Sequence, residues 1–180
     1  MGETRERLLL HCCCGPCSTA SVERLLEAGY DVTLFFGNSN IWPESETERR
    51  FEALKKVADT YSLPLIRSVA DHAGWLQAIK GLEGEREGGK RCEACFRYNL
   101  TEARQVAQKA GIGLYTTTLT ISPLKKSPLI FAVGNELEGF VAIDFKKRGG
   151  YLKSIQLSRQ LDLYRQDYCG CEFSKRHSSE

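Results

Sequence analysis

Cysteine placement is the feature that most constrains this chain. Eight of its 180 residues are cysteines, a content below the roughly 8–10% typical of small disulfide-stapled domains. A lone buried cysteine behaves as a small apolar side chain, which does not explain why these eight occur in tight groups. Clustered thiols in a chain long enough to bury its own core indicate metal ligation or redox chemistry. The three groups are Cys12, Cys13, Cys14 and Cys17, then Cys92 and Cys95, then Cys169 and Cys171.

The rest of the composition is typical of a globular protein. Hydrophobic residues make up 42% and charged residues 27% of the chain. No stretch approaches the roughly 18 apolar residues of a membrane span, so no membrane partner is expected. The first residues, MGETRER, carry mixed charge and lead only into a short apolar run, which is not the pattern of a secretory signal peptide. We therefore expect a cytoplasmic protein, in which structural disulfides are rare.

Strand-like and helix-like segments alternate along the chain. This alternation predicts an α/β fold in which a parallel sheet carries helices on both faces, as in Rossmann-type three-layer domains. No linker or repeat divides the chain, so residues 1–180 are expected to form one domain, with 169–180 as a mobile C-terminal tail. Strands are predicted at 7–12, 31–36, 65–69, 114–120 and 140–145, and helices at 16–28, 46–61, 71–79, 92–110, 127–138 and 153–168.

The first cysteine group lies between the first predicted strand and the first predicted helix. In open α/β sheets the carboxyl ends of the strands are the usual ligand site. The helix that begins near Pro16 offers unpaired N–H groups and positive potential, which stabilise thiolates. A phosphate-binding loop at this place would need several glycines, whereas the segment has only Gly15. The sequence therefore predicts a metal site at the end of the first strand.

Two kinds of metal site fit the spacing. The CxxC motifs at 14–17 and 92–95 match a tetrahedral zinc site formally. An iron–sulfur cluster also takes four thiolates. The zinc interpretation leaves Cys12 and Cys13 unused beside the site, so the spacing favours iron and sulfur without excluding zinc.

The third group has a different pattern. Cys169 and Cys171 are separated by Gly170, which gives the backbone freedom to bring the two thiols together. A disulfide in so small a ring is strained and easily reduced. The pair is therefore interpreted as a redox relay, with a role as two further metal ligands as the alternative. Tyr168 beside the pair and Tyr151 upstream are candidate proton donors, although tyrosines at such places often serve packing alone.

Basic residues gather in the last third of the sequence. Between positions 121 and 165, eight basic residues stand against four acidic ones. Two runs follow strand-like segments and are therefore expected at the same sheet edge as the cysteines, where they suit contacts to RNA phosphates. A solvated basic face without a ligand is an equally good interpretation of charge alone. The residues of the two runs are Lys125, Lys126, Lys146, Lys147 and Arg148.

The ordered set of motifs resembles the QueH family of epoxyqueuosine reductases. The resemblance runs from His11 to Ser174. It implies a HUP-like α/β fold and a cobalamin-independent enzyme that removes the epoxide oxygen of epoxyqueuosine at the wobble position of tRNA. An external electron donor of the ferredoxin, flavodoxin or thiol type would be a second partner. The motifs are HCCCGPCS, GNSNIWP followed by Arg49-Arg50, RCEACFRYNL, TTTLTISPLKK and DFKKRGGY…LYRQDYCGC.

The resemblance also implies roles for the thiols. It predicts a redox-active pair at 169–171 and an additional iron next to a [4Fe–4S] cluster. Because alternate residues of an extended chain point to opposite sides, a cluster that uses both Cys12 and Cys13 needs a turn between them. Asp144 is a further candidate at the additional iron. The predicted cluster ligands are Cys12, Cys13, Cys92 and Cys95, and Cys14 and Cys17 are left for the additional iron.

Two other functions remain open at this stage. One is a different iron–sulfur or zinc enzyme acting on tRNA, such as a thiolase on the same fold. The other is a non-catalytic RNA-binding module stabilised by a metal. Analysis of bound metal separates zinc from iron and sulfur, and mass analysis of modified tRNA separates the activities.

Overall fold

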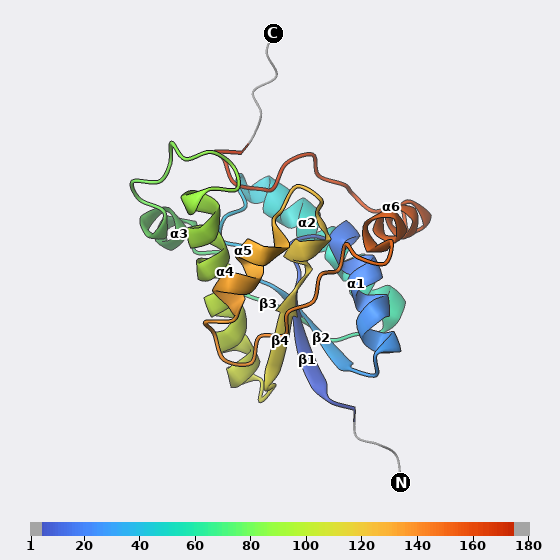
Figure 1. Cartoon of the computed structure of the whole chain (residues 1–180). Coiled ribbons are helices and arrows are strands. Elements are labelled where there is room, and N and C mark those ends of the chain that lie inside the picture. The colour runs from blue at the N-terminus through green and yellow to red at the C-terminus, as the bar shows by residue number, and fades with distance from the viewer. Residues whose placement is uncertain (1–4, 175–180) are drawn as a thin grey trace.

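Four parallel strands form the centre of the molecule, in the order β3–β2–β1–β4 (Figure 1). The computed structural model describes residues 5–174; residues 1–4 and the end of the predicted tail, 175–180, lie outside the described part. In the register of the sheet, Leu9 of β1 lies opposite Thr33 of β2 and Tyr115 of β4. The strands are β1 (Arg7–His11), β2 (Asp31–Phe36), β3 (Leu65–Arg67) and β4 (Leu114–Thr117).

Helices cover both faces of this sheet, which confirms the predicted three-layer α/β fold (Figure 1). Leu8 and Leu10 pack against α1 and α2, and α6 lies on α1. Leu9 faces the other way, toward α4 and α5, and α3 packs beside α4. No helix within residues 5–174 has the length and apolar character to cross a membrane. The helices are α1 (Gly15–Glu27), α2 (Glu44–Tyr61), α3 (His72–Ala78), α4 (Lys90–Lys109), α5 (Ser127–Gly134) and α6 (Gly150–Gln160).

The strand predicted at 140–145 is absent from the structure, which shows only an isolated bridge between Tyr115 and Phe140. Threonine hydroxyls donate hydrogen bonds to backbone carbonyls of this segment that would pair with a neighbouring strand in a sheet. Thr116 donates to the Val141 carbonyl over 2.7 Å, and Thr120 donates to the Ile143 carbonyl over 2.8 Å. Side chains thus satisfy backbone groups that would otherwise pair in a ladder.

The helix predicted at 153–168 is also wrong at its end. Helix α6 stops at Gln160, and Asp162 adopts a left-handed conformation with φ 49°, which ends the helix. The chain then crosses the carboxyl edge of the sheet as a non-helical segment, 161–170. The predicted strand 114–120 and helix 127–138 are shorter as well. The strand ends at Thr117 in a 3₁₀ turn, Thr118–Ile121, and α5 ends at Gly134.

Candidate functional site

A buried histidine organises the carboxyl edge of the sheet. The neutral His11 ring accepts a hydrogen bond at Nδ1 from the Thr117 hydroxyl over 2.9 Å, because both partners of Nε2 are oxygen acceptors and the ring proton therefore lies on Nε2. Its Nε2–H then donates to the Gly37 carbonyl and the Asn38 side chain, each at 3.1 Å. Burial lowers the pKa of His11, so the ring is neutral. His11 therefore connects the ends of β1, β2 and β4 and is not available as a metal ligand.

Three thiols of the first group meet directly after this histidine. The sulfur atoms of Cys13, Cys14 and Cys17 all lie within 4.8 Å of one another. Cys14 is the N-cap of α1, where its sulfur accepts a hydrogen bond from the Cys17 N–H over 3.2 Å. The Cys13 sulfur lies 3.9 Å from the Cys14 sulfur and 3.4 Å from the Thr118 hydroxyl. The set offers thiol donors alone, which are the ligands of iron–sulfur and zinc centres.

Of the three thiols in this set, Cys13 is the one that ionises most easily. Hydrogen bonds from Cys14 and Cys17 hold the pKa of Cys13 well below its usual range. Burial raises the pKa of Cys14 to about 12. The hydrogen bond to Cys13 likewise raises the pKa of Cys17 well above its usual range. Without a cation the site therefore holds one thiolate, and a metal ion would favour deprotonation of the other thiols.

Cys12 points away from this set. Its sulfur lies in the apolar cluster with Leu8 and Leu10 and is 3.2 Å from the Leu10 carbonyl. Strand alternation continues through Cys13, which shares the other sheet face with Leu9. The chain turns one residue later than a ligand set with Cys12 requires, so Cys14, and not Cys12, lies on the side of Cys13.

The second group lies in the first turn of α4. The Cys92 sulfur accepts a hydrogen bond from the Gly88 N–H over 3.1 Å, and the Cys95 sulfur lies 3.6 Å from the Asn99 amide. Burial raises the pKa of Cys92, and it raises the pKa of Cys95 to about 12. Cys95 also packs with Trp75, on the side where the third group arrives.

The two thiols of the third group face each other. The Cys169 and Cys171 sulfur atoms are 3.9 Å apart and unbonded, and the Ser174 hydroxyl lies 2.8 Å from the first and 3.3 Å from the second. The hydrogen bond from Cys171 lowers the pKa of Cys169 to about 5 and raises the pKa of Cys171. At neutral pH the pair therefore consists of one thiolate and one thiol, the state suited to thiol–disulfide exchange.

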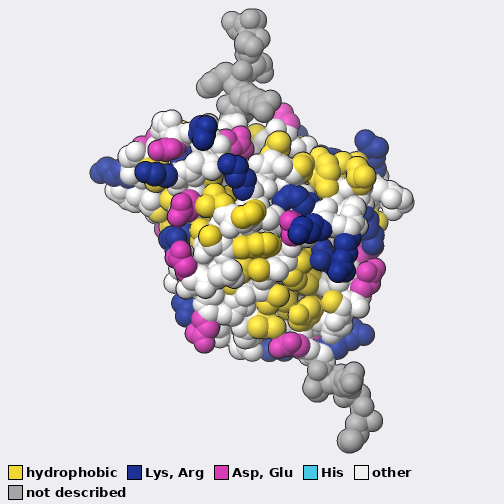
Figure 2. All heavy atoms as spheres, viewed as in Figure 1, with side chains coloured by type: hydrophobic (Ala, Val, Ile, Leu, Met, Phe, Trp, Pro, Cys, Tyr) yellow, Lys and Arg dark blue, Asp and Glu magenta, His cyan; other side chains and the backbone are white. Residues whose placement is uncertain are grey.

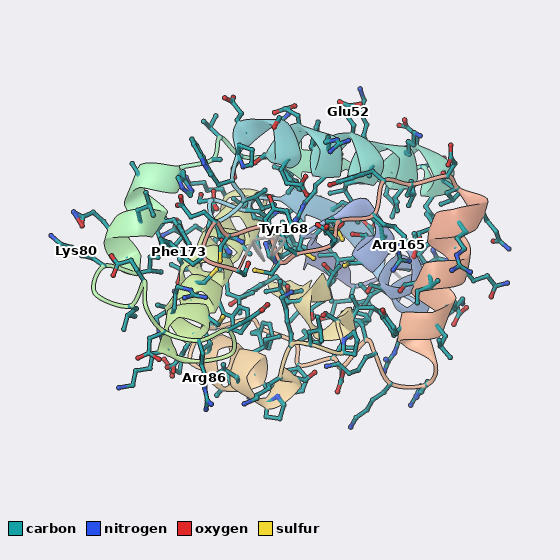
Figure 3. All side chains as sticks on the ribbon, turned by 90° about the horizontal axis from the view of Figure 1, so that it is seen from above. Glu52, Lys80, Arg86, Arg165, Tyr168 and Phe173 are labelled. Atoms are coloured by element: carbon teal, nitrogen blue, oxygen red, sulfur yellow. The ribbon has the colours of Figure 1, made fainter. Side chains whose placement is uncertain are left out.

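All three groups line one cavity above the sheet. This thiol cavity has a volume of about 40 Å³. A neighbouring, larger cavity of about 360 Å³ shares Cys13 and Cys169 with it and extends toward Cys17 and Tyr168. Figure 3 shows Tyr168 near the middle of this edge, with Phe173 on the α3 and α4 side and Arg165 on the α6 side. The thiols lining the first cavity are Cys13, Cys92, Cys95, Cys169 and Cys171.

Lys125 is the basic residue that the two thiol cavities share. It lines both cavities, with Cys13 and Cys169. Burial would lower the pKa of Lys125, but the thiolates of Cys13 and Cys169 outweigh it and raise the pKa. Lys125 thus remains a cation beside the thiol groups, and its contact with tRNA phosphate stays a prediction.

The other predicted basic residues divide into two kinds. Lys126, Lys147 and Arg148 are exposed, and Figure 2 shows Lys and Arg side chains gathered on part of the face drawn there. Lys146 is held in place, since its Nζ donates to the Lys125 carbonyl over 3.1 Å and to the Ser127 hydroxyl over 2.5 Å.

Asp144 and Tyr168 have partners other than the thiols. An Asp144 carboxylate oxygen lies 3.6 Å from the Lys146 Nζ, and Asp144 lines neither thiol cavity. The Tyr168 hydroxyl donates to the Trp42 carbonyl over 2.7 Å, while the residue lines the larger cavity. The structure thus brings Tyr168 to the site and leaves Asp144 outside it.

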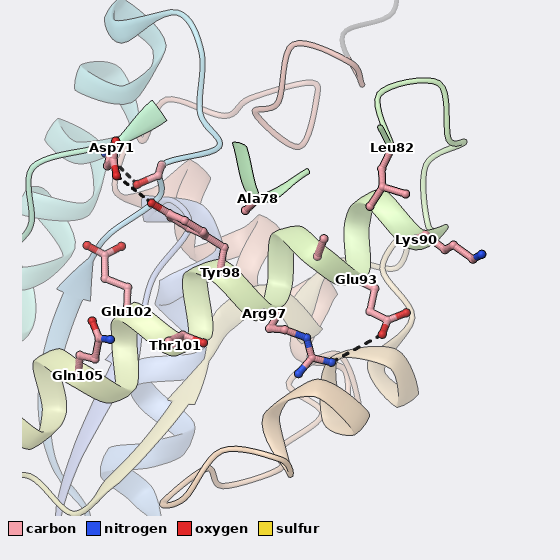
Figure 4. Close-up of a pocket in the computed structure, with 12 residues that line it drawn as sticks. Asp71, Ala78, Leu82, Lys90, Glu93, Arg97, Tyr98, Thr101, Glu102 and Gln105 are labelled. Atoms are coloured by element: carbon pink, nitrogen blue, oxygen red, sulfur yellow. Dashed lines mark hydrogen bonds and ion pairs between the residues drawn. The ribbon is translucent and has the colours of Figure 1, made fainter. Parts of the chain in front are cut away.

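A wider groove, of about 890 Å³, lies on the outer face of α4 and is separate from the thiol cavities (Figure 4). Its lining carries both charge signs, including the Arg97–Glu93 pair at 3.7 Å and Asp71, which accepts from the Tyr98 hydroxyl. No cysteine lines it. The groove therefore adds nothing to the redox or metal chemistry.

Sequence reasoning missed the polar residues that hold the third group. Arg50 is 1% exposed and donates to the backbone carbonyls of Tyr168 and Cys169. Gln166 was missed as well: it lines the cavity of about 360 Å³, and its side-chain amide lies 3.9 Å from the sulfur of Cys17 in the first thiol group. The charged amphipathic pattern of α2 gives no sign that one of its arginines is buried, so only the contacts reveal the role.

Comparison with known proteins points to one family. The profile described as epoxyqueuosine reductase QueH matches residues 8–177. The epoxyqueuosine reductase QueH of Streptococcus pyogenes is 36% identical over 96% of this chain and 71% of its own length. That of Thermotoga maritima is 38% identical over 93% of this chain and 89% of its own.

A solved structure shares the fold. The U34-tRNA thiolase NcsA from Methanococcus maripaludis, with its [4Fe–4S] cluster, superposes with a TM-score of 0.60 over 97% of this chain and 63% of that one. At 10% identity this likeness concerns the fold alone. It gives no support to thiolation over reduction.

Proposed function

The chain belongs to the epoxyqueuosine reductase QueH family, and we propose that it reduces epoxyqueuosine to queuosine on tRNA at the thiol-lined cavity above the sheet. One observation carries this location of the activity. A candidate metal ligand, Cys13, and the CxxC thiols of α4 line the same cavity as the Cys169/Cys171 pair. A two-electron reduction that is fed by a one-electron cluster needs a second redox group near that cluster. This cavity brings the candidate residues of both together.

The dithiol pair balances the reaction. Removing the epoxide oxygen as water and leaving a carbon–carbon double bond consumes two electrons and two protons. Closing the Cys169 thiolate and the Cys171 thiol to a disulfide breaks one S–H bond, forms one S–S bond and releases two electrons and one proton; solvent supplies the second proton. The lowered pKa of Cys169 keeps its sulfur in the thiolate form, which is the nucleophile of thiol–disulfide exchange. An external donor of the ferredoxin, flavodoxin or thiol type then reopens the disulfide.

We assign the [4Fe–4S] cluster to Cys13, Cys14, Cys92 and Cys95. The first two are adjacent thiols on one side of the chain, and the last two share a cavity with Cys13. The predicted set with Cys12 is less well supported, because the Cys12 sulfur lies in the apolar cluster on the opposite sheet face. When bound, such a cluster supplies electrons one at a time.

The additional iron stays a prediction. Of its predicted ligands, Cys17 lies in the thiol set and Asp144 pairs with Lys146. Tyr168 stays a candidate proton donor at the edge of the larger cavity. The cobalamin-independent route is likewise a prediction, tested by activity without any added corrinoid.

The tRNA is expected to approach over the basic edge. Lys126, Lys147 and Arg148 are exposed and able to meet phosphates, whereas Lys125 and Lys146 are engaged inside the protein. The modified base must leave its stack to reach this edge, as in other enzymes that act on nucleobases. The neighbouring cavity of about 360 Å³, which shares Cys13 and Cys169 with the thiol cavity of about 40 Å³, has the room for it.

A direct assay tests the proposed function. Iron-replete protein is incubated anaerobically with tRNA that carries epoxyqueuosine and with a chemical reductant, and the nucleosides are then analysed by mass spectrometry. The proposal predicts loss of one oxygen atom from epoxyqueuosine. Sulfur incorporation at a wobble uridine would indicate a thiolase instead, and unchanged epoxyqueuosine with bound RNA would indicate a binding module. Iron and acid-labile sulfide in the protein, without zinc, support the assigned centre.

A further inference from the structure

We propose that Arg50 is a positioning residue that holds the segment around Gly170 so that the Cys169 and Cys171 thiols stay together. The inference rests on the redox role proposed above for this pair. It concerns a side chain of α2 that is distant in sequence and does not contact either sulfur through any described hydrogen bond.

Arg50 binds the backbone of the pair directly. Its two terminal nitrogens donate to consecutive carbonyls, Nη1 to Cys169 and Nη2 to Tyr168, each over 2.9 Å. Its carbon Cζ also lies 5.2 Å from the centre of the Tyr168 ring. The flat, forked guanidinium matches two adjacent acceptors, which a lysine ammonium does not.

A second layer fixes the guanidinium itself. Glu46, one turn earlier on α2 and 6% exposed, accepts a hydrogen bond from the Arg50 Nε over 2.7 Å. The other Glu46 oxygen accepts from the Tyr164 hydroxyl, also over 2.7 Å. The buried positive charge thus has a buried negative partner, without which its burial would be costly. Tyr164 belongs to the same segment as the thiol pair, so both ends of that segment are tied to α2.

A backbone hydrogen bond from Trp42 also fixes the segment around Gly170. The Trp42 N–H donates to the Gly170 carbonyl over 2.9 Å, so three consecutive carbonyls from 168 to 170 are bound by the 42–50 region. Gly170 has φ 118°, a conformation that favours glycine. A Cβ there would lie 2.9 Å from Ile41 and 3.0 Å from the Arg50 Nη1. The segment therefore fits in one arrangement, with its two thiols 3.9 Å apart.

Fixing the backbone around Gly170 affects the equilibrium between the dithiol and the disulfide of Cys169 and Cys171. A pair of thiols already held together loses little conformational freedom when it closes, so its effective concentration is high. Release of the carbonyls lowers that concentration and makes the disulfide less favourable. Arg50 is thus expected to stabilise the disulfide relative to the dithiol.

The test measures this equilibrium in Arg50→Lys. The holoprotein is equilibrated anaerobically with glutathione buffers, where closure of the pair converts one oxidised glutathione into two reduced molecules. Thiols are then alkylated, and the tryptic peptide 166–175 reports the pair alone because it contains no other cysteine. We expect the equilibrium constant for closure to fall about tenfold, which corresponds to a shift of about 30 mV in the potential of this two-electron couple.

Matched variants separate positioning from a loss of folding. Arg49→Lys changes the exposed neighbouring arginine, whose guanidinium lies 4.6 Å from the Tyr164 ring centre, and should leave the constant unchanged. Tyr164→Phe removes only the hydroxyl that orients Glu46, so it should give a smaller fall in the same direction and serves if Arg50→Lys does not fold.

Distinct results would overturn the inference. An unchanged or larger equilibrium constant in both Arg50→Lys and Tyr164→Phe would show that Arg50 does not favour closure, whether or not the enzyme reduces epoxyqueuosine. A wild-type pair that never closes would remove the redox role and the inference together. Failure of the tRNA assay with a normal shift in the constant would instead count against the proposed function alone.

Discussion

At the scale of single residues, His11 carries more of the site than its position suggests. Its ring connects three strand ends through Thr117, Gly37 and Asn38, and every ring nitrogen has a partner. The loops that present the first thiol group therefore depend on a neutral imidazole. Protonation would place a charge in the desolvated interior and would cost the fold stability.

The pH dependence of stability follows from this arrangement. Since the pKa of His11 is lowered in the folded state from its ordinary 6.5, the unfolded chain binds the extra proton first as the pH falls. The contribution is fully present above pH 6.5 and is lost progressively below it. We expect the free energy of unfolding of wild type to fall between pH 7 and pH 5, measured by denaturant titration.

The control for this prediction is His11→Asn. It should lower stability at pH 7 by about 1–3 kcal/mol, because partners of the ring lose their hydrogen bonds. Its stability should then vary less with pH over the same interval. An equally steep pH dependence in the variant would show that other groups cause the loss.

Cys12 and Cys14 offer a second test at this scale. Cys14 lies in the thiol set, while the Cys12 sulfur lies among apolar side chains. We expect Cys14→Ala to lose most of the bound iron and sulfide and Cys12→Ala to retain them, measured by metal and sulfide analysis of anaerobically purified protein. Loss of iron from Cys12→Ala, with Cys14→Ala unaffected, would restore the ligand set that the family resemblance implied.

At the scale of elements, the approach of α1 to α2 positions the first thiol group. Helix α1 begins at Gly15, directly after Cys14, and a Cβ on Gly15 would lie 2.7 Å from the Ala53 backbone. Gly15→Ala therefore pushes the two helices apart. We expect a loss of about 1–3 kcal/mol of stability from such overpacking, together with weaker iron retention.

The matched control is Gly84→Ala in the exposed loop before α4. No atom lies within 4 Å of a Cβ at that position, and its backbone needs no positive φ. Denaturant titration of both variants should show a change for Gly15→Ala alone. Equal stability of the two variants would mean that α1 and α2 adjust without cost.

Elements with strong local signals were predictable from the sequence. The second strand has the predicted bounds, Asp31–Phe36, because four of its six residues are β-branched or aromatic and turns flank it. The segment 140–145 has a similar pattern but does not form a strand. The hydroxyls of Thr116 and Thr120 donate hydrogen bonds to its carbonyls instead. Helix α6 ends at Gln160, and the left-handed position that follows it is occupied by Asp162 instead of a glycine, so the local sequence carries no clear stop signal. The conformation of such segments is set by tertiary contacts, which the secondary-structure propensities of the residues do not reveal.

At the scale of the whole molecule, the sequence predicted that distant groups meet. Parallel strands bring their carboxyl ends to one edge, which is why the first two cysteine groups and Lys125 were expected together. Which sulfur faces which side depends on where the chain turns after Cys13, one residue later than the family resemblance suggested. The buried pair of Arg50 and Glu46 looks in sequence like any surface ion pair of a charged helix.

The same edge should bind the anticodon region through exposed cations. We expect the double variant Lys147→Ala and Arg148→Ala to bind tRNA more weakly and with a salt dependence reduced by about one counterion per lost phosphate contact. Fluorescence anisotropy over a series of salt concentrations measures both. Lys109→Ala, at the far end of α4, is the control and should behave as wild type. A double variant with unchanged affinity and slope would place the RNA elsewhere.

The central claim is that the thiol pair supplies the electrons for reduction at the shared cavity. It is tested by a single turnover of prereduced holoprotein with epoxyqueuosine-containing tRNA and no external reductant, scored by queuosine formed and by the state of peptide 166–175. The account predicts one Cys169–Cys171 disulfide for each queuosine, and no sustained turnover in Cys171→Ser when reductant is supplied. Queuosine formed while both thiols stay reduced, or multiple turnovers at the wild-type rate in Cys171→Ser, would contradict it.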